Sequence, residues 1–450
     1  MFKSDFLWGV AAAAHQIEGA AIIDGRGPSV WDTYCTRHDA ILDHADASVA
    51  CDHYHRYKED ISLMKKLGVH SYRLSLSWSR MFPDGDTSRP NEKGIEFYDN
   101  LINELVSAGI RPLVTLFHWD YPQALEDKGG WRSPECSDYF EKYAEFVAKH
   151  FGDRVTDFIT INEPQCYIVN GHIKGFHAPG YQLSQSDINK LVHNMHLCHG
   201  KAVRALRKYS PQPLNISISL VGNVKVPYDQ NSIEDLEMAT KFMNSGHRDA
   251  DAMWADPIYL GKFPDDIDVH MPGLKDLYTA EDMALISQPL DFYGVNLYSS
   301  QYVRSLGDGK WEFVDFPSDG ERNNMGWPVI PEVMYYAIRH FHNKYHLPVI
   351  ITENGFPATD IVDVDGEIHD GSRITFVKKY LLQVERAIDE GYDCAGYFYW
   401  SILDNFEWEY GYRPRFGIIR VDYSTQKRTL KDSAKWYSEV IRTNGNHLHD

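Results

Sequence analysis

The chain has 450 residues, of which 43% are hydrophobic and 13% aromatic, so it can bury a large core. Its formal net charge of −19 disfavours nucleic acid and anionic membranes as partners, because both attract surfaces rich in Lys and Arg. No apolar run approaches the length of a membrane-spanning helix, which makes a membrane protein unexpected.

The start of the chain and its cysteines predict a cytoplasmic protein. The apolar stretch 10–14 is short and runs directly into His15, Gln16 and Glu18, which is a poor match to a signal peptide. Six cysteines are scattered along the chain without a Cys-x-x-Cys pair, a usage that suits reduced thiols better than a disulfide framework.

Short apolar runs rich in β-branched and aromatic residues recur along the chain and alternate with helical patterns. They predict eight strands, at 6–11, 71–75, 112–118, 158–162, 215–220, 292–296, 349–353 and 395–400. Helices are predicted between them, at 60–66, 94–107, 137–151, 193–208 and 375–390, and most of these end at a glycine. Eightfold alternation is typical of a closed (β/α)8 TIM barrel.

Domain organisation follows from the absence of linkers. No Ser/Gly-rich or Pro-rich tract, like-charge block or fixed-period repeat interrupts the chain, so 1–450 is expected to be one catalytic barrel domain with long loops. The alternative fold is a doubly wound open sheet. That fold usually has a glycine-rich first turn, whereas here the first strand is followed by alanines and His15.

Polar and aromatic residues stand at the ends of nearly all these strands, where barrel enzymes carry their chemistry. Singly, each of them is also explained as a satisfied structural residue, but that explanation is weak for the whole set. The candidates are Gln16, Arg73, His118, Trp119, Asn162, Glu163, Asn296, Tyr298, Glu353, Trp400, Glu407 and Trp408.

Two of these candidates, Glu163 and Glu353, are carboxylates on opposite sides of the ring of strands. Hydrolysis of a glycosidic bond needs such a pair, one protonated to assist the leaving oxygen and one ionised to attack the anomeric carbon or activate water. Arg73, Asn296 and Tyr298 are candidate stabilisers of an ionised Glu353. Either glutamate alone is also compatible with a buried structural ion pair.

Eight short segments, found in one order, are more specific than either glutamate alone. Residues 160–164 (TINEP) and 351–355 (ITENG) contain the two glutamates. The other segments are 6–19 (FLWG to AAHQIEG), 52–57 (DHYHRY), 72–80 (YRLSLSWSR), 117–120 (FHWD), 325–327 (MGW) and 405–408 (NFEW). With these segments the chain resembles glycoside hydrolase family 1 from residue 6 to about residue 417.

The resemblance implies a retaining β-glycosidase of the β-glucosidase type, with Glu353 as nucleophile and Glu163 as acid and then base. Retention implies carboxyl groups roughly 5–5.5 Å apart. By the same resemblance, sugar hydroxyls are held by Gln16, His118, Asn162, Glu407 and Trp408, with Trp119 and Tyr298 also in the substrate site. Trp400 forms the platform under the ring, and Trp327 lines the leaving-group side.

Sequence differences among members of the family narrow the range of expected substrates. Glu163 is intact, whereas plant thioglucosidases replace the acid with Gln. The Glu407-Trp408 pair stands where members that act on 6-phosphorylated sugars typically differ, and an anionic Glu407 would repel phosphate. The expected substrates are small β-glucosides and oligosaccharides with a terminal non-reducing glucose. Galactose and fucose remain open alternatives, and the oligomeric state is not predicted.

A metal-dependent hydrolase is the first rival. Two groups of residues could suggest a metal site: His53-x-His55, and the group His193, His196, Cys198 and His199. Neither group has the further ligands needed to complete a metal site, so we interpret these residues as part of the helix surface or the packed core. Residues 363–367 (DVDGE) hint at a calcium loop, but a hairpin turn explains them. We therefore expect neither a metal nor an organic cofactor.

A sugar-binding module without catalysis is the second rival. Such a module would keep the aromatic platform but would tolerate the loss of a catalytic glutamate. Both glutamates are present, which disfavours it.

Overall fold

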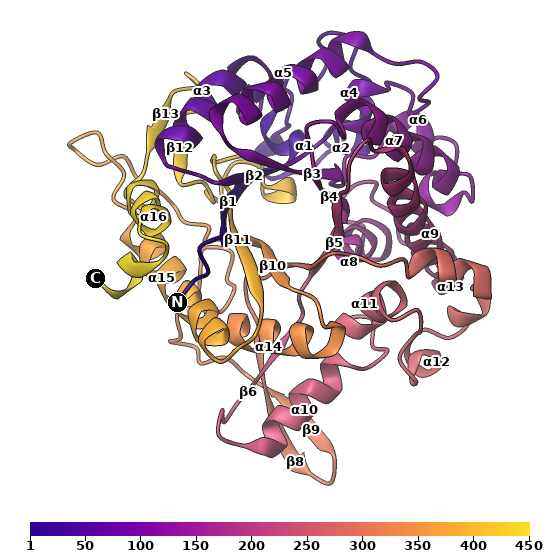
Figure 1. Cartoon of the computed structure of the whole chain (residues 1–450), viewed down its shortest axis with the longest axis vertical. Coiled ribbons are helices and arrows are strands. Elements are labelled where there is room, and N and C mark those ends of the chain that lie inside the picture. The colour runs from indigo at the N-terminus through magenta and orange to yellow at the C-terminus, as the bar shows by residue number, and fades with distance from the viewer.

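In the computed structural model, which describes residues 1–450, eight parallel strands close into a barrel (Figure 1). They are β1 (Leu7–Ala11), β2 (Ser71–Ser75), β3 (Arg111–Phe117), β4 (Asp157–Asn162), β5 (Asn215–Val221), β7 (Tyr293–Asn296), β10 (Val349–Asn354) and β11 (Cys394–Trp400). Their order around the barrel is β1-β11-β10-β7-β5-β4-β3-β2. The eight predicted strands are confirmed to within one residue at each end, and closure of the barrel excludes the open sheet.

The barrel strands are buried on both faces, which is why the sequence shows continuous apolar runs rather than alternation. Every residue of β2, β4 and β10 is buried. Inside the barrel, Leu113, Ile159, Ile350 and Phe398 belong to one small cluster of buried apolar side chains that includes Trp400. The larger apolar core lies between the barrel and its helices.

Eight helices follow the eight barrel strands and form the outer layer. They are α3 (His53–Lys66), α5 (Glu92–Ala108), α7 (Cys136–Phe151), α9 (Gln185–Tyr209), α11 (Asp251–Tyr259), α14 (Val333–Tyr345), α15 (Gly371–Asp389) and α16 (Asp432–Arg442). The five predicted helices are confirmed, but α3, α9 and α15 begin earlier than predicted because their first turns are largely polar. Ser184 caps α9 by accepting a hydrogen bond from the backbone N–H of Asp187.

Additional elements extend the loops of the barrel. A three-stranded sheet of β6 (Lys225–Pro227), β8 (Gln301–Gly307) and β9 (Lys310–Val314) projects with α10 (Ile233–Met243) at the bottom of Figure 1. Strands β12 (Ile419–Val421) and β13 (Arg428–Leu430) form an antiparallel pair. Residues 363–367 form the expected turn, in which the backbone N–H of Gly366 donates to the carbonyl of Asp363 at 2.9 Å.

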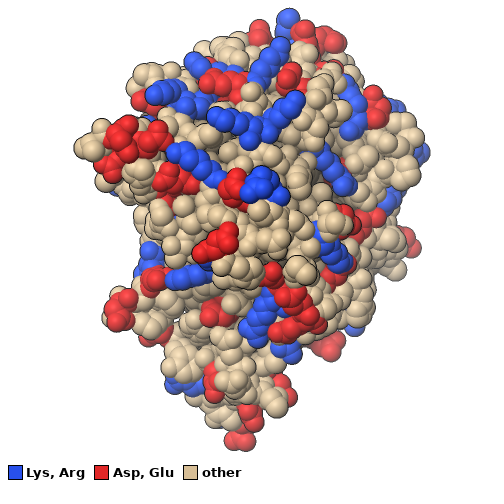
Figure 2. Space-filling view, turned by 60° about the vertical axis from the view of Figure 1, so that its left-hand side comes forward, with Lys and Arg blue, Asp and Glu red and all other residues tan.

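The surface agrees with the charge pattern of the sequence. Figure 2 shows basic side chains interrupted by acidic ones over the face in view. This face has no continuous basic surface of the kind that binds nucleic acids. Among the helices, none combines the length and the apolar character needed to cross a bilayer.

Candidate active site

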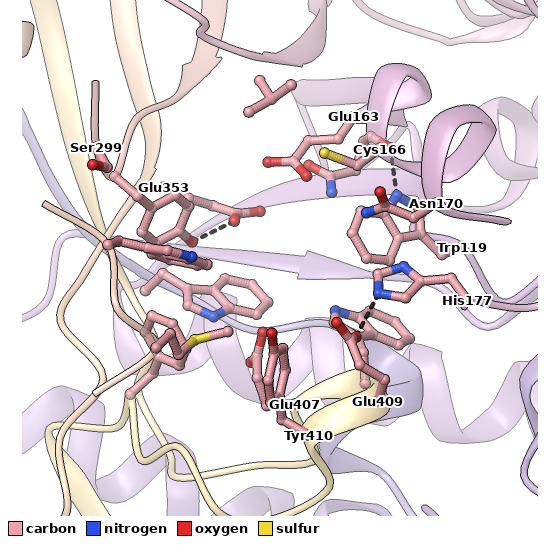
Figure 3. Close-up of a pocket in the computed structure, with 18 of the residues that line it drawn as sticks. Trp119, Glu163, Cys166, Asn170, His177, Ser299, Glu353, Glu407, Glu409 and Tyr410 are labelled. Atoms are coloured by element: carbon pink, nitrogen blue, oxygen red, sulfur yellow. Dashed lines mark hydrogen bonds and ion pairs between the residues drawn. The ribbon is translucent and has the colours of Figure 1, made fainter. Parts of the chain in front are cut away.

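A pocket of about 400 Å³ opens where the barrel strands end, within the size range usual for ligand sites (Figure 3). Most of the predicted site residues line it. These are His118, Trp119, Asn162, Glu163, Tyr298, Trp327, Glu353, Trp400, Glu407 and Trp408. Gln16, Arg73 and Asn296 do not line the pocket, but each hydrogen-bonds a residue that does. The fold therefore brings the whole predicted set to one place.

Glu163 is placed by a sharp change of direction after β4. Its φ is 42°, and it forms the N-terminal boundary of α8 (Pro164–Ile168), which starts with a proline that suits that position. Its backbone N–H donates to the carbonyl of Ser219 on β5 at 2.7 Å. Trp119 and Trp408 also have positive φ values, of 75° and 48°. Such strained residues concentrate at functional sites, because the surrounding structure must hold them.

The Glu163 carboxyl is almost fully enclosed, and its surroundings favour the protonated form. Burial and the negative charge of Glu353 raise the pKa of Glu163 to about 7, against the opposing effect of a hydrogen bond from Asn296. A carboxylic acid with that pKa keeps a large part of its proton near neutral pH. It can therefore act as a general acid.

Glu353 stands in a different environment, at the end of β10. The guanidinium of Arg73 forms an ion pair with one of its carboxylate oxygens, and the hydroxyl of Tyr298 donates to the other at 2.7 Å. Charge-assisted contacts of this kind stabilise an ionised carboxylate. Figure 3 shows Glu163 and Glu353 pointing toward one another, so a proton donor and an anion face the same space.

Asn296 corrects one expectation from the sequence. Its side-chain amide donates to Glu163 at 2.8 Å and to Asn162 at 3.0 Å, rather than supporting Glu353. The reason is the direction of its side chain. Hydroxyls of Ser219 and Thr352 donate to its oxygen at 2.8 and 2.7 Å, which turns the amide N–H groups toward the end of β4.

Donors and acceptors for a polyol surround the deeper part of the pocket. Gln16 donates to Glu407 at 3.4 Å and to the carbonyl of Phe406 at 2.8 Å, and its own side-chain oxygen has no partner. Asn162 and His118 are hydrogen-bonded at 3.1 Å. Burial and Arg73 hold the pKa of His118 well below its ordinary value, so the ring is neutral and offers both a donor and an acceptor.

The charge of Glu407 differs from the expectation of a simple anion. Burial, followed by the charges of Glu409 and Glu353, raises the pKa of Glu407 well above its ordinary value. Glu407 therefore repels a phosphate group less than the sequence indicated. Phosphorylated sugars are disfavoured more by the lining of the pocket, which contains no Lys or Arg, so a phosphate group would find no cationic partner there.

Aromatic rings form the walls of the pocket. His118 stacks on Trp400 with ring centroids 5.7 Å apart, and Trp327 meets Tyr298 at 5.6 Å. Gly355, two residues after Glu353, allows the backbone that follows β10 to approach the end of β11 closely. A Cβ at that position would lie 1.7 Å from the carbonyl oxygen of Trp400, so no other residue fits.

Several lining residues were not predicted from the sequence. They are Cys166, Asn170, Phe176, His177, Val221, Gly222, Asn223, Ser299, Met325, Glu409, Tyr410 and Phe416. Some of these residues could have been found from their position in the chain, because residues 166–177 follow Glu163 closely and Glu409 follows Trp408 directly. Contacts between distant segments could not have been found in this way. For example, His177 bonds Glu409 at 2.5 Å although 232 positions separate them.

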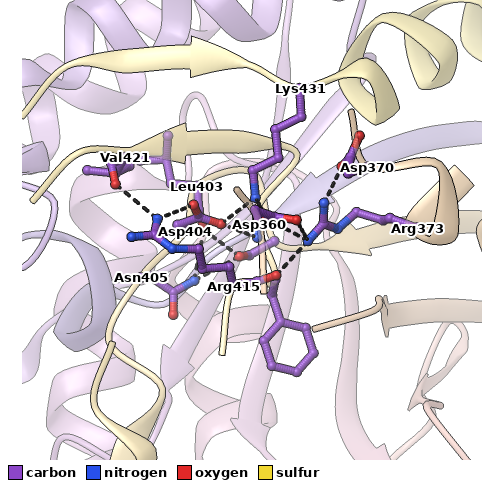
Figure 4. A network of polar contacts seen from close by, with 12 residues as sticks. Asp360, Asp370, Arg373, Leu403, Asp404, Asn405, Arg415, Val421 and Lys431 are labelled. Atoms are coloured by element: carbon purple, nitrogen blue, oxygen red, sulfur yellow. Dashed lines mark hydrogen bonds and ion pairs between the residues drawn. The ribbon is translucent and has the colours of Figure 1, made fainter. Parts of the chain in front are cut away.

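A buried ionic network (Figure 4) supports the loop that follows Glu353 and the loop that carries Glu407. Lys431, which is 0% exposed, pairs with Asp360 and with Asp404, the latter at 2.7 Å. Arg373 pairs with Asp360 at 2.9 Å and donates to the carbonyl of Phe356 at 3.2 Å. Phe356 follows Glu353 by three positions and Asp404 precedes Glu407 by three, so the network joins both loops.

The histidines that could suggest a metal site each contact a different polar side chain. The His53 ring contacts Asp60 at 2.7 Å, and His55 contacts Asp52 at 2.6 Å. On α9, the contacts are His193 with Asp282, His196 with Tyr278, His199 with Thr160 and Cys198 with Cys136. These side chains do not converge on a common point. All six cysteines are free thiols.

Comparison with known proteins gives a consistent result. The model of glycosyl hydrolase family 1 matches residues 1–446. Beta-glucosidase A of Acetivibrio thermocellus is 41% identical over 99% of both chains, and beta-glucosidase A of Thermotoga maritima is 41% identical over 99% of this chain and 98% of its own. The structure of beta-glucosidase from Thermotoga maritima in complex with deoxynojirimycin superposes with a TM-score of 0.90 at 40% identity, covering 99% of both chains.

Proposed function

Because the chain belongs to glycosyl hydrolase family 1, we propose that it is a retaining β-glucosidase that releases a terminal non-reducing β-linked glucose. The observation that carries this proposal is the contrast between two carboxyl groups in one pocket. Glu163 has a pKa of about 7, whereas Glu353 is held by a guanidinium and a phenol hydroxyl.

Two displacements follow from this contrast. Glu353 attacks the anomeric carbon while Glu163 gives its proton to the departing oxygen, which leaves a glycosyl group covalently bound to Glu353. Glu163, now ionised, takes a proton from a water molecule as that water attacks the same carbon. Sugar is released with its β configuration retained, and both side chains return to their starting states.

Recognition of the sugar is assigned to the residues around this pair. We place Gln16, His118, Asn162 and Glu407 against the hydroxyl groups, because together they supply amide, imidazole and carboxyl partners. Trp400 lies beneath the ring, with Trp119 and Trp408 beside it and Trp327 toward the leaving group. Arg73 and Tyr298 position Glu353, and Asn296 positions Glu163. The substrate is a small neutral carbohydrate.

The test is a comparison of kcat/KM for the 4-nitrophenyl β-glucoside, β-galactoside, β-fucoside and 6-phospho-β-glucoside. The plain glucoside is expected to lead the series. An inert glucoside beside an active phosphorylated one would contradict the sugar assignment while leaving the roles of Glu163 and Glu353 possible. Inertness toward all four would overturn the proposed activity.

A further inference from the structure

A hollow of about 420 Å³ lies in the outer layer of the barrel, between α10 and α14, and has no role in the mechanism above. Figure 1 shows α10 below α14, on the side from which β8 and β9 project. The hollow shares no residue with the catalytic pocket, and its volume falls within the range of small-molecule sites. Its lining consists of Leu236, Thr240, Met243, Asn244, Tyr336, Arg339, His340, Asn343 and Lys344.

The lining of this hollow is cationic, although the chain as a whole has a formal net charge of −19. Arg339 and Lys344 contribute positive charges, and no Asp or Glu is among the lining residues. Lys344 already pairs with Asp256 at 2.7 Å. The guanidinium of Arg339 forms neither an ion pair nor a hydrogen bond within the protein. An anion in the hollow therefore meets a positive charge that no carboxylate has yet compensated.

Neutral hydrogen-bonding groups surround the two cations. Lys344 donates to the side-chain oxygen of Asn244 at 2.7 Å, so the amide N–H groups of Asn244 remain available as donors. Burial and the charge of Lys344 lower the pKa of His340 to about 3, so its ring is neutral. The Nε2 atom of His340 is buried without a partner, and a neutral imidazole can donate from that atom.

An apolar wall completes the hollow. Leu236, Met243 and Tyr336 stand among the lining residues, beside the hydroxyl of Thr240 and the amide of Asn343. This combination suits a small polyol, because a sugar ring has apolar faces and a rim of hydroxyl groups. A bare phosphate ion would use the cationic part of the hollow and leave the apolar wall uncovered.

We propose that this hollow binds a phosphorylated sugar, with the phosphate group against Arg339 and Lys344 and the sugar ring against the apolar wall. A guanidinium can hold two phosphate oxygens at once, and the ammonium group adds a further charge-assisted contact. The amides and His340 donate to the remaining phosphate oxygens. Because the hollow and the catalytic pocket share no residue, this ligand binds beside the substrate rather than in its place.

The test measures binding of glucose 6-phosphate and of inorganic phosphate by isothermal titration calorimetry. We expect both to bind, and glucose 6-phosphate to bind about tenfold more tightly, the size of one or two hydrogen bonds to the sugar. Equal affinity for the two would overturn the assignment of the sugar ring to the apolar wall. No binding of either probe at millimolar concentration would overturn the proposal altogether.

Two variants locate the ligand. Arg339→Gln removes the uncompensated charge and should weaken the binding of glucose 6-phosphate by about 10–100-fold, the usual size of a charge-assisted hydrogen bond. Thr240→Trp fills the hollow while keeping both cations, and should abolish binding. Unfolding temperatures measured beside the titrations show that each variant is folded. Unchanged affinity in either folded variant would place the ligand elsewhere and overturn the proposal.

Arg442→Gln is the matched control. Arg442 is also a helical arginine, but it belongs to α16, is 68% exposed and pairs with Glu439 at 2.6 Å. It does not line the hollow, so its replacement should leave the affinity for glucose 6-phosphate unchanged. A loss of affinity equal to that of Arg339→Gln would mean that the phosphate responds to the overall charge of the protein, which would contradict a site at this hollow.

Discussion

The side-chain amide of Asn296 donates to Glu163 at 2.8 Å. A donor to a carboxylate favours the ionised form, so this contact opposes burial and the charge of Glu353, which raise the pKa of Glu163 to about 7. Ser219 and Thr352 hold the oxygen of the amide, so Asn296 cannot turn its acceptor toward Glu163. The pKa of the acid is thus set by a balance between these neighbours.

This balance predicts the pH dependence of the enzyme. Glu163 must carry a proton in the first step, so kcat/KM is expected to fall as the pH rises through about 7. Asn296→Ala removes a donor that favours ionisation and should move this alkaline limb to higher pH. The measurement is kcat/KM against pH for both proteins. An alkaline limb that stays in place or moves to lower pH would contradict the role of Asn296.

The role of Glu163 as acid predicts a dependence on the leaving group. Glu163→Ala should lower the rate on substrates with alcohol or sugar leaving groups by about 10²–10⁴-fold, the usual contribution of a general acid. Leaving groups that are stable as anions, such as dinitrophenol, need no proton and should be affected far less in the first step. Pre-steady-state rates of phenol release measure that step. Equal losses on both classes would exclude Glu163 as the acid.

The assignment of Glu353 is tested by replacing it with a small anion. Glu353→Gly should abolish ordinary turnover, because no group remains to attack the anomeric carbon. Azide added to this variant can enter the vacated space and attack from the same face, giving an α-glycosyl azide from an aryl β-glucoside. Product configuration by NMR is the measurement. Substantial hydrolysis by the variant without azide would show that another residue is the nucleophile.

The barrel and the candidates Glu163 and Glu353 could be predicted from the sequence because both depend on local patterns. Continuous apolar runs predict the eight strands, and their ends give Glu163 and Glu353 as candidates, whereas the roles of the two glutamates came from the resemblance of the segments around them to the family. The partner of Asn296 was wrong because it depends on which way an amide is turned, and Ser219 and Thr352 set that from neighbouring strands.

Contacts between loops that are distant in the chain could not be predicted from local sequence patterns either. His177 and Glu409 meet only because the loops after β4 and β11 converge over the pocket. Lys431 and Asp404 give no local signal of their pairing either, since a lone lysine near the start of a helix is usually a solvated residue. Such contacts arise from the closure of the barrel rather than from spacing along the chain.

Protonation of Glu407 predicts how substitutions there behave. Because the pKa of Glu407 is raised well above its ordinary value, a neutral amide should replace part of its function. Glu407→Gln is therefore expected to keep more kcat/KM on the aryl glucoside than Glu407→Ala, which removes the hydrogen-bonding group altogether. Equal losses in the two variants would show that the enzyme uses the negative charge of Glu407 itself.

The buried network behind the site predicts a large effect on stability. Lys431→Met would leave Asp360 and Asp404 without their shared cation in a region that water does not reach. Breaking a buried ion pair in this way costs about 3–5 kcal/mol. We expect a clear fall in the unfolding temperature and a raised KM, because Asp404 lies in the loop that positions Glu407.

Lys435→Met is the matched control for this prediction. Lys435 pairs with Glu367 at 2.9 Å, but its side chain is 52% exposed, so water and salt screen the pair. Such surface pairs contribute less than about 1 kcal/mol, so neither the unfolding temperature nor the KM should change measurably. Thermal unfolding and kinetics of the two variants side by side separate the cases. Similar behaviour of both proteins would mean that the network does not hold the Glu407 loop.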